Sequence, residues 1–336
     1  MTPRFTVSIP TYNRADILRD TLAQVCLLVS LHQNQVGEEI EVLTIDNAST
    51  DQTHDICREF AGRYGFFRFI RNTENIGLIQ NIRKAIVSAQ SEYVWTLGDD
   101  DYPAPWCMTR ISQVITYAEA HSIDHPFQLY SLAYATPDFR LSAQRSSAQP
   151  IQLLSPGCSI LAEETIHGIA LISRWVFVRK YWDDDYFDQV YLDSDIYTFV
   201  NVMLRAALQL PALIIASPVA IASDRGSRAY YHPKTAIARV IEFPQIENLV
   251  LAHHGMRQGR KLLACERKNW LGDRVPFLLK LNVLRDEYAN VQKWLQRPIS
   301  LFWQERMLHG FIRWLTTIPL LKRWLLKKYR QRKTTS

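Results

Sequence analysis

The 336-residue chain is poor in cysteine, and the few cysteines it has are far apart. There are five of them, an odd number, and no two form a Cys-x-x-Cys pair. This pattern argues against a disulfide framework and against a zinc site, and it is typical of a reducing compartment. We therefore expect a cytoplasmic protein.

Glycine is scarce too, at 12 residues, and the glycine-rich phosphate-binding loops are absent. No G-x-G-x-x-G follows the first strand-like segment, and G-x-x-x-x-G-K-[ST] occurs nowhere. A dinucleotide site and a P-loop are therefore not expected. A haloacid-dehalogenase-type phosphatase would carry an aspartate pair after the first strand, where this chain has Pro10 and Thr11.

Long apolar runs are missing as well. The most apolar stretch, 206–222, is interrupted by Gln209, Pro211 and Pro218, and it is shorter than the roughly 20 residues that a spanning helix needs. Residues 1–4 lead directly into a strand-like segment, so no signal peptide is expected.

Acidic residues are nearly absent from one region, the C-terminal tail. Residues 297–333 hold ten Lys or Arg and a single acid, Glu305, whereas the whole chain has 39 basic and 33 acidic residues. The net charge of +6 therefore belongs to the tail, and the body is mildly acidic. A nucleic-acid-binding surface would be expected to spread over the body, so no nucleic-acid partner is predicted.

The first 97 residues alternate between strand-like and helix-like segments. Strands are predicted at 5–9, 40–45, 66–70 and 93–97, with a helix after each of the first three. This alternation predicts an α/β fold with a mostly parallel sheet flanked by helices. Asn13 is expected to begin the first helix, and Ser49 or Thr50 to cap the second.

The fourth predicted strand, 93–97, runs through Gly98 into three consecutive aspartates, Asp99, Asp100 and Asp101. A buried strand that ends in an acid cluster places carboxylates at the rim of a sheet, where open α/β folds bind ligands. A cation would relieve the repulsion between the three charges, and Mg²⁺ or Mn²⁺ prefers carboxylate and phosphate oxygens. The alternative is an acidic turn that is simply solvated.

Four motifs together resemble the family 2 glycosyltransferases with the GT-A fold. They occur in that family's order and near its spacing: Val7 to Arg14, Ile45 to Asp51, Asn75 to Gly77, and Leu97 to Asp101. The Leu-Gly-Asp-Asp-Asp variant, with Ile172 to Arg174 and Val178 to Trp182, is similar to the abequosyltransferase-like branch. That branch builds O-antigen and other surface polysaccharides.

The resemblance implies a donor site and a metal site. Donor-binding residues would be Pro10, Thr11, Tyr12, Asn13, Arg14, Asp46, Asn75, Gly77 and Asp99, with Asp46 accepting a hydrogen bond from the base. Asp46 could instead be an acid that caps a turn. Asp100 and Asp101 would hold Mg²⁺ or Mn²⁺. Gly98 stands where the family's Asp-x-Asp-Asp pattern has its first aspartate.

The resemblance also implies the reaction, an inverting transfer of a sugar that needs one general base. The family's base is an aspartate at the start of a helix after the donor-binding half. Asp195 fits that location best and Asp193 second. The run Asp183 to Asp185 is expected to be a solvated turn.

The predicted function is transfer of a hexose or deoxyhexose from a nucleotide-sugar to a glycan acceptor that is itself lipid-linked. The predicted domains are a donor-binding half at 1–105, an acceptor-binding half at 106–234 and a helical, basic extension at 235–336. Three alternatives remain open. They are a nucleotidyltransferase, an inactive sugar-nucleotide-binding module and a membrane scaffold.

The tail is predicted to form a basic amphipathic helix. Apolar residues recur at helical spacing, as Leu308, Phe311, Ile312 and Leu315 and then as Leu321, Trp324 and Leu325, and basic residues surround the second group. Such a helix suits the headgroup layer of an anionic membrane. We therefore expect a peripheral protein at the inner face of the cell membrane. The alternative is that the first apolar group packs on the catalytic domain.

Overall fold

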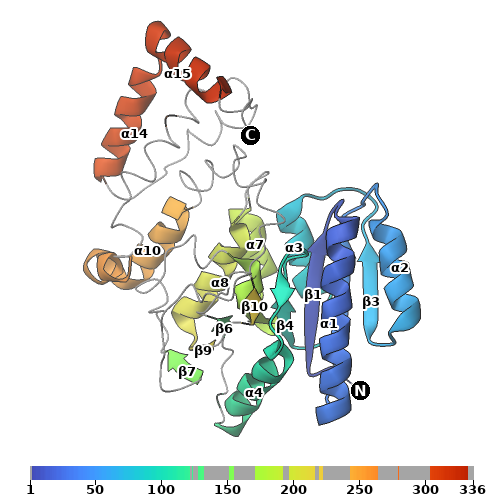
Figure 1. Ribbon diagram of the computed structural model, residues 1–336. Coiled ribbons are helices and arrows are strands. Elements are labelled where there is room, and N and C mark those ends of the chain that lie inside the picture. Colours follow the sequence, from blue (N-terminus) through green and yellow to red (C-terminus); the bar gives the residue numbers. More distant parts are fainter. Residues whose placement is uncertain are drawn as a thin grey trace. The chain divides into compact units, whose positions relative to one another are not determined.

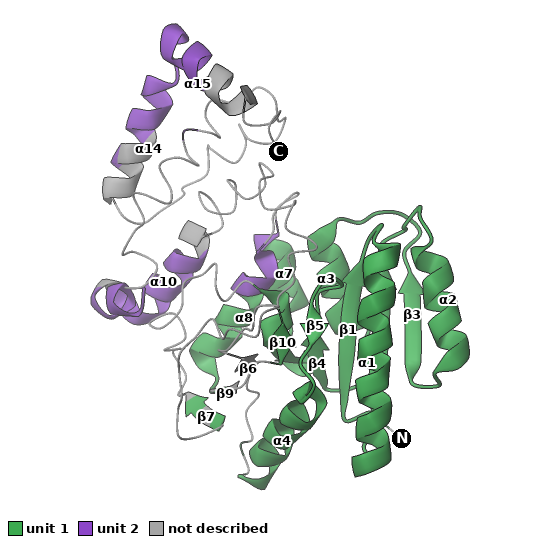
Figure 2. Ribbon diagram, viewed as in Figure 1, with its two compact units in different colours: residues 1–159, 167–189, 202–228 green, residues 160–166, 190–201, 229–336 purple. Residues whose placement is uncertain are grey.

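The computed structural model describes residues 2–121, 123, 128–131, 151–154, 171–191, 197–215, 219–221, 243–263, 279 and 303–331. The chain divides into two compact units (Figure 2). Unit 1 comprises residues 1–159, 167–189 and 202–228, and unit 2 comprises residues 160–166, 190–201 and 229–336. The finer division at residues 105 and 234 stays a prediction.

Unit 1 holds all the described strands and the helices that cover them (Figure 1). The strands are β1 (Phe5–Thr11), β2 (Ile40–Asp46), β3 (Phe67–Arg71), β4 (Tyr93–Thr96), β5 (Tyr102–Pro103), β6 (Gln128–Ser131), β7 (Ile151–Leu154), β8 (Trp175–Val178), β9 (Ala212–Ile215) and β10 (Ala220–Ile221). The α-helices are α1 (Ala15–Val36), α2 (Thr53–Arg63), α3 (Leu78–Val87), α4 (Cys107–Ala120), α7 (Asp184–Val190) and α8 (Thr198–Gln209), the last two contributing to both units. Single 3-10 turns, η1 (Ile172–Arg174) and η2 (Arg179–Tyr181), flank β8.

Eight strands form the main sheet in the order β3-β2-β1-β4-β8-β6-β9-β7. The first four pair in parallel, as the sequence predicts, and β8 then pairs antiparallel to β4. Strands β2 and β3 follow β1 on one side of it, and β4 lies on the other side of β1. The carboxyl ends of β1 and β4 therefore lie at the point where the strand order reverses, and open α/β sheets bind ligands there.

Helices cover both faces of the parallel half. Val7, Ile9 and Val42 on one face pack in a single core cluster with apolar residues of α1, α2 and α4. Leu43 and Ile45, which alternate with Val42 along β2, pack on the other face with α3. Every residue of β1 and of β2 is buried, as expected for parallel strands with helices on both faces.

The strand β1 continues through Pro10 to Thr11, two residues beyond the predicted end. The Ser8 carbonyl accepts a hydrogen bond from Leu97 N on the β4 side, and by alternation Pro10 faces the same side. β4 has already ended at Thr96, which pairs with Ser8. No neighbour therefore needs the N–H that proline lacks, and β1 can continue.

Outside α7 and α8, the secondary-structure elements described in unit 2 are all helices. Its helices are α10 (Phe243–Leu262), which bends at Gly255, α14 (Trp303–Leu315) and α15 (Pro319–Gln331). These helices agree with the predicted helical extension. None of the helices in the described part of the chain is both long and apolar enough to cross a membrane.

Candidate active site

Polar side chains gather at the carboxyl ends of the four parallel strands. β1 ends at Thr11, β2 at Asp46, β3 at Arg71, and the Asp99 to Asp101 run follows β4. Because parallel strands end at the same edge of a sheet, residues far apart in the sequence meet here, and Thr11 contacts Asp99 across 88 positions.

The acidic run lies against the end of β1 and the beginning of α1. Thr11 Oγ1 donates a hydrogen bond to Asp99 Oδ2 at 2.7 Å, and Thr21 Oγ1 donates to the Asp99 carbonyl at 2.8 Å. One guanidinium nitrogen of Arg14 lies 3.1 Å from Asp99 Oδ1 and 2.7 Å from Asp100 Oδ2. The sequence predicts that a cation relieves the repulsion between these carboxylates. In the structure, the guanidinium of Arg14 provides positive charge beside two of them.

Asp99 is the most buried acid of the run, with 7% of its surface exposed. Burial raises the pKa of its carboxyl to about 6, and the neighbouring charge of Asp100 adds to this, while Arg14 and Thr11 act in the opposite direction. At pH 7 the group is mostly ionised but less firmly than an exposed aspartate. Asp99 is thus built into the fold as a hydrogen-bonded anchor of the loop.

Asp100 and Asp101 each place one carboxylate oxygen close to Gly98. A Cβ atom at Gly98 would lie 3.2 Å from Asp100 Oδ1 and 3.2 Å from Asp101 Oδ2. Asp101 Oδ2 also accepts a hydrogen bond from Ser173 Oγ, which in turn accepts one from Gly98 N at 2.8 Å. A side chain at position 98 would crowd both carboxylates and Ser173 Oγ, which would have to shift by a few tenths of an ångström.

The residues fit a divalent cation only if a substrate completes its coordination. Within the described ranges, no group of three or more His, Cys, Asp or Glu side chains is arranged to hold a metal. Two neighbouring carboxylates are nonetheless the donor set with which Mg²⁺ and Mn²⁺ are held when phosphate and water oxygens supply the other ligands. Asp100 and Asp101 stay the predicted metal ligands on this ground.

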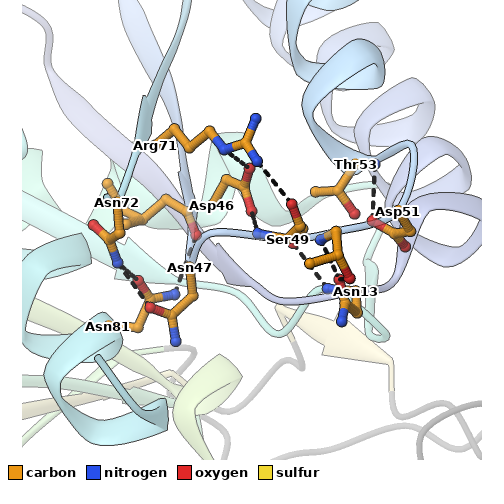
Figure 3. Close-up of polar contacts among 11 residues, drawn as sticks. Asn13, Asp46, Asn47, Ser49, Asp51, Thr53, Arg71, Asn72 and Asn81 are labelled. Atoms are coloured by element: carbon orange, nitrogen blue, oxygen red, sulfur yellow. Dashed lines mark hydrogen bonds and ion pairs between the residues drawn. The ribbon is translucent and has the colours of Figure 1, made fainter. Parts of the chain in front are cut away.

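Asp46 is fully buried at the end of β2. Its Oδ1 accepts a hydrogen bond from Ser49 N at 2.9 Å, and Arg71 Nε lies 3.5 Å from its Oδ2 (Figure 3). Oδ2 accepts no hydrogen bond from the described residues, although burial makes an unmet acceptor costly. The turn-capping role that the sequence left open therefore exists, and the second oxygen, Oδ2, is buried next to Arg71.

The predicted caps of α1 and α2 are wrong, because a different residue supplies them. Asn13 has a left-handed backbone, with φ of 52°, and its Oδ1 accepts a hydrogen bond from Thr50 N at 2.7 Å. Ser49 Oγ accepts one from Asn13 N. Asp51 instead binds the first N–H groups of both helices, Ala15 N at 3.0 Å and Thr53 N at 3.0 Å (Figure 3). This one carboxylate joins the loops that follow β1 and β2.

Replacing Asp51 with alanine is expected to lower the free energy of unfolding by about 1–2 kcal/mol, the usual cost of a lost helix cap. Burial raises the pKa of Asp51, but hydrogen bonds from Thr53 and Ala15 outweigh it, so the pKa lies below its ordinary value. The stabilisation is therefore present above the pKa of an unfolded aspartate and is lost as the pH falls through the lower folded pKa. Urea unfolding from pH 7 down to acid measures this, with Glu74→Ala, an exposed acid in the loop before α3, as the control. An equal loss of stability for both variants would contradict the assignment.

A second network, made of asparagines, holds the loop between β3 and α3. Asn72 Nδ2 donates to Asn47 Oδ1 at 2.8 Å and to Asn81 Oδ1 at 3.0 Å. Asn47 Nδ2 donates to Asn75 Oδ1 at 2.8 Å, and Asn75 Oδ1 also accepts from Gly77 N at 2.9 Å. Gly77 has φ of 82° and ψ of 162°, a conformation open essentially only to glycine. The Asn-x-Gly motif thus shapes this loop whether or not it touches a ligand.

Asn72→Ala is expected to destabilise the fold by about 2–3 kcal/mol, because it leaves a buried amide oxygen of Asn81 and the ammonium of Lys84 without their partner. Thermal unfolding compared with that of Thr73→Ala, a change at the next, exposed position, measures the effect. A loss no larger than that of the control would show that the network contributes little.

The second acidic run is not the solvated turn that the sequence predicts. Asp184 and Asp185 form the first turn of α7, where the helix dipole favours negative charge. Arg83 lies 2.7 Å from Asp184 and 2.9 Å from Asp188, and Arg205 lies 2.8 Å from Asp183. Asp183 and Asp184 are therefore paired with basic side chains from elsewhere in the chain, although about half of each side chain stays exposed to solvent.

The predicted bases, Asp193 and Asp195, lie outside the described residues. Helix α8 begins at Thr198, three residues after Asp195. Both aspartates stay predictions.

Three residues shape the site in ways that the sequence does not predict. The sequence assigns Arg14 to the donor and not to the acids, includes Ser173 only as part of a motif, and gives Arg71 no role. Pro10 and Thr11, assigned to a loop, belong to β1. Tyr12 is exposed beside them, and its role in donor binding stays a prediction.

The comparison with protein families identifies this region. Residues 6–139 match the model of glycosyl transferase family 2. The match covers residues 6–139, which include all four motifs, and it confirms the resemblance over that part of the chain.

Curated relatives resemble the same part of the chain. Abequosyltransferase RfbV of Salmonella typhimurium is 33% identical over 94 residues, which are 28% of this chain and 27% of that protein. The putative teichuronic acid biosynthesis glycosyltransferase TuaG of Bacillus subtilis is 28% identical over 130 residues, 39% of this chain and 48% of that protein. Each match spans less than half the length of the relative.

Solved structures agree in fold over nearly the whole chain. Residues 1–349 of S. aureus TarS in complex with UDP-GlcNAc align with a TM-score of 0.59 and 15% identity, covering 97% of this chain and 91% of that one. The mannosyltransferase PcManGT from Pyrobaculum calidifontis, in complex with GDP-Man and Mn²⁺, aligns with a TM-score of 0.50 and 15% identity, covering 96% and 83%. The predicted GT-A fold is thereby confirmed.

Proposed function

We propose that the protein transfers a sugar from a nucleotide-sugar donor to a glycan acceptor in the synthesis of a surface polysaccharide. The observation that carries this proposal is the meeting of Thr11, Arg14 and the acidic run at the strand-order reversal of a family 2 domain. The relatives support it, since they include an abequosyltransferase and a poly(ribitol-phosphate) beta-glucosyltransferase. The acceptor would be lipid-linked, and the sugar a hexose or deoxyhexose.

The donor would lie along the carboxyl ends of β1 and β2. Tyr12 and Asn13 are exposed there, and Asp46 lies buried at the end of β2. For Asp46 Oδ2 to accept an N–H of the base, donor binding would have to uncover this oxygen, which in the structure lies beside Arg71. TarS is described with UDP and UDP-GlcNAc, and PcManGT with GDP-Man, so both a pyrimidine and a purine donor remain candidates.

Asp100 and Asp101 would hold Mg²⁺ or Mn²⁺ when the donor is bound. The ion would supply positive charge to the departing nucleoside diphosphate. Arg14 would then be free to leave Asp100 and to pair with phosphate, for which a guanidinium is well suited. An inverting displacement needs one base to take the proton of the acceptor hydroxyl, and Asp195 or Asp193 would serve.

A screen of UDP-, GDP-, CDP- and dTDP-sugars tests the proposal. The protein is expected to release nucleoside diphosphate from one class of donor in the presence of Mn²⁺ or Mg²⁺, and to release much less after EDTA. An inactive binding module would release none from any of them.

A further inference from the structure

The two helices at the end of the chain expose large apolar side chains together with positive charge. Met307, Phe311 and Trp314 of α14 are 68%, 53% and 60% exposed. Leu320 and Trp324 of α15 are 78% and 58% exposed. We call these five residues the apolar ridge.

Helical spacing places the ridge residues of each helix on one face. Met307, Phe311 and Trp314 fall at i, i+4 and i+7, and Leu320 and Trp324 fall at i and i+4. The rings of Phe311 and Trp314 stack with centroids 6.0 Å apart. Each helix therefore presents an apolar strip that includes a tryptophan.

The ridge is not the face that these helices bury. Ile312 and Leu325 are 2% and 6% exposed, and Thr316 is completely buried. The sequence pattern places Phe311 with Ile312, and Trp324 with Leu325, in one apolar stripe. The structure separates the two members of each pair, since one is buried and the other exposed. Packing within the protein thus accounts for Ile312 and Leu325 but not for the ridge.

Positive charge accompanies the ridge. Arg313 and Arg323 are exposed on the same two helices, and α15 carries five Lys or Arg and no acid in its 13 residues. Tryptophan and phenylalanine beside Lys and Arg, on helices too short and too polar to span a bilayer, suit a position in the headgroup layer of a membrane. Exposed apolar patches of several large side chains mark a docking surface. The positive charge beside this patch favours a partner that is negatively charged.

We propose that the apolar ridge docks on the surface of an anionic lipid bilayer, with Phe311, Trp314 and Trp324 inserted among the headgroups and the neighbouring basic side chains paired with lipid phosphates. This docking does not depend on the proposed transfer reaction, because it needs neither donor nor acceptor. The proposed binding partner of the ridge is lipid, and not a second copy of the chain or unit 1.

Co-sedimentation of the full chain with vesicles tests the proposal. The wild type is expected to pellet with vesicles that contain phosphatidylglycerol and to pellet far less with phosphatidylcholine alone, with binding that weakens as salt rises. Phe311→Ser/Trp314→Ser is expected to reduce binding at least about tenfold, since it removes two aromatic groups from the interface. Lys322→Glu/Arg323→Glu is expected to reduce binding to anionic vesicles by at least about tenfold, because each basic residue contributes about fivefold.

Leu27→Ser/Leu31→Ser is the matched control. These two leucines are an exposed i, i+4 pair on α1, 56% and 46% exposed, and lie far from the tail in the sequence. The control is expected to bind vesicles as the wild type does. If it loses as much binding as the ridge variant, or if the wild type does not pellet with anionic vesicles at low salt, the proposal is wrong.

Two further measurements keep the test independent of folding. Quenching of tryptophan fluorescence by brominated lipid should be strong in the wild type and reduced in Trp314→Phe/Trp324→Phe, a pair of changes that keeps an aromatic ring at both places. Light scattering without lipid should show no change of mass between the wild type and Phe311→Ser/Trp314→Ser. A dimer that the ridge variant abolishes would assign the ridge to a second copy of the chain and overturn the proposal.

Discussion

Replacing Asp100 or Asp101 with alanine is expected to slow sugar transfer by about 10³-fold or more, equivalent to about 4 kcal/mol of transition-state stabilisation. Both carboxylates lie close to Gly98, and each variant removes one of the two carboxylates proposed to hold the cation. Removing the metal from the wild type with EDTA should have a comparable effect, reversed by Mn²⁺ or Mg²⁺. Release of nucleoside diphosphate from the donor identified by the screen measures both.

Two controls separate this effect from a general loss of charge or of structure. Asp185→Ala removes an exposed acid from the first turn of α7 and should leave the rate unchanged. Thermal unfolding should show that Asp100→Ala keeps its fold, because Arg14 retains its contact with Asp99. Full activity of Asp100→Ala in the presence of chelator would show that the reaction needs no metal ion.

Asp195→Asn is expected to lower transfer by about 10²–10⁴-fold while donor binding persists. The substitution keeps the shape of the side chain and removes its ability to accept a proton. Binding of nucleoside diphosphate by calorimetry, beside transfer to an acceptor glycan, distinguishes the loss of a base from the loss of a donor contact.

Asp193→Asn is the paired variant, two residues away. If it shows the loss and Asp195→Asn does not, the order of the two candidates is reversed. If neither loses transfer, the base lies elsewhere. Asp188, which forms an ion pair with Arg83, would be tested next.

The sequence predicted the strands and helices of the donor-binding half because their signals are local. Apolar periodicity located β1 to β4 and α1 to α3 within a few residues. It ended β1 too early at Pro10, because whether proline can continue a strand depends on what lies beside it. Here β4 has already ended on that side.

The polar contacts of the site could not be predicted in the same way. Asp51 reaches Ala15 across 36 residues, and Arg14 reaches Asp100 across 86. Such pairs follow from which strands lie side by side, and the sequence indicates only that the strands are parallel. For the same reason it predicted a metal between the carboxylates but missed Arg14 as their counter-charge.

The tail shows the limit of periodicity. Ile312 and Phe311 are neighbours in the predicted apolar stripe, yet one is buried and the other exposed. Helical spacing identifies an apolar face but does not say how much of that face the rest of the protein covers.

Calorimetric binding of nucleoside diphosphates in the presence and absence of Mn²⁺ tests the central claim most directly, namely that the acidic run after β4 forms the donor site. One of UDP, GDP, CDP and dTDP should bind to the wild type only with Mn²⁺. The same nucleotide should lose at least about tenfold in affinity in Asp100→Ala and in Asp101→Ala, and should keep its affinity in Asp185→Ala. Binding that is equally tight in all four proteins, with or without the metal, would contradict the account.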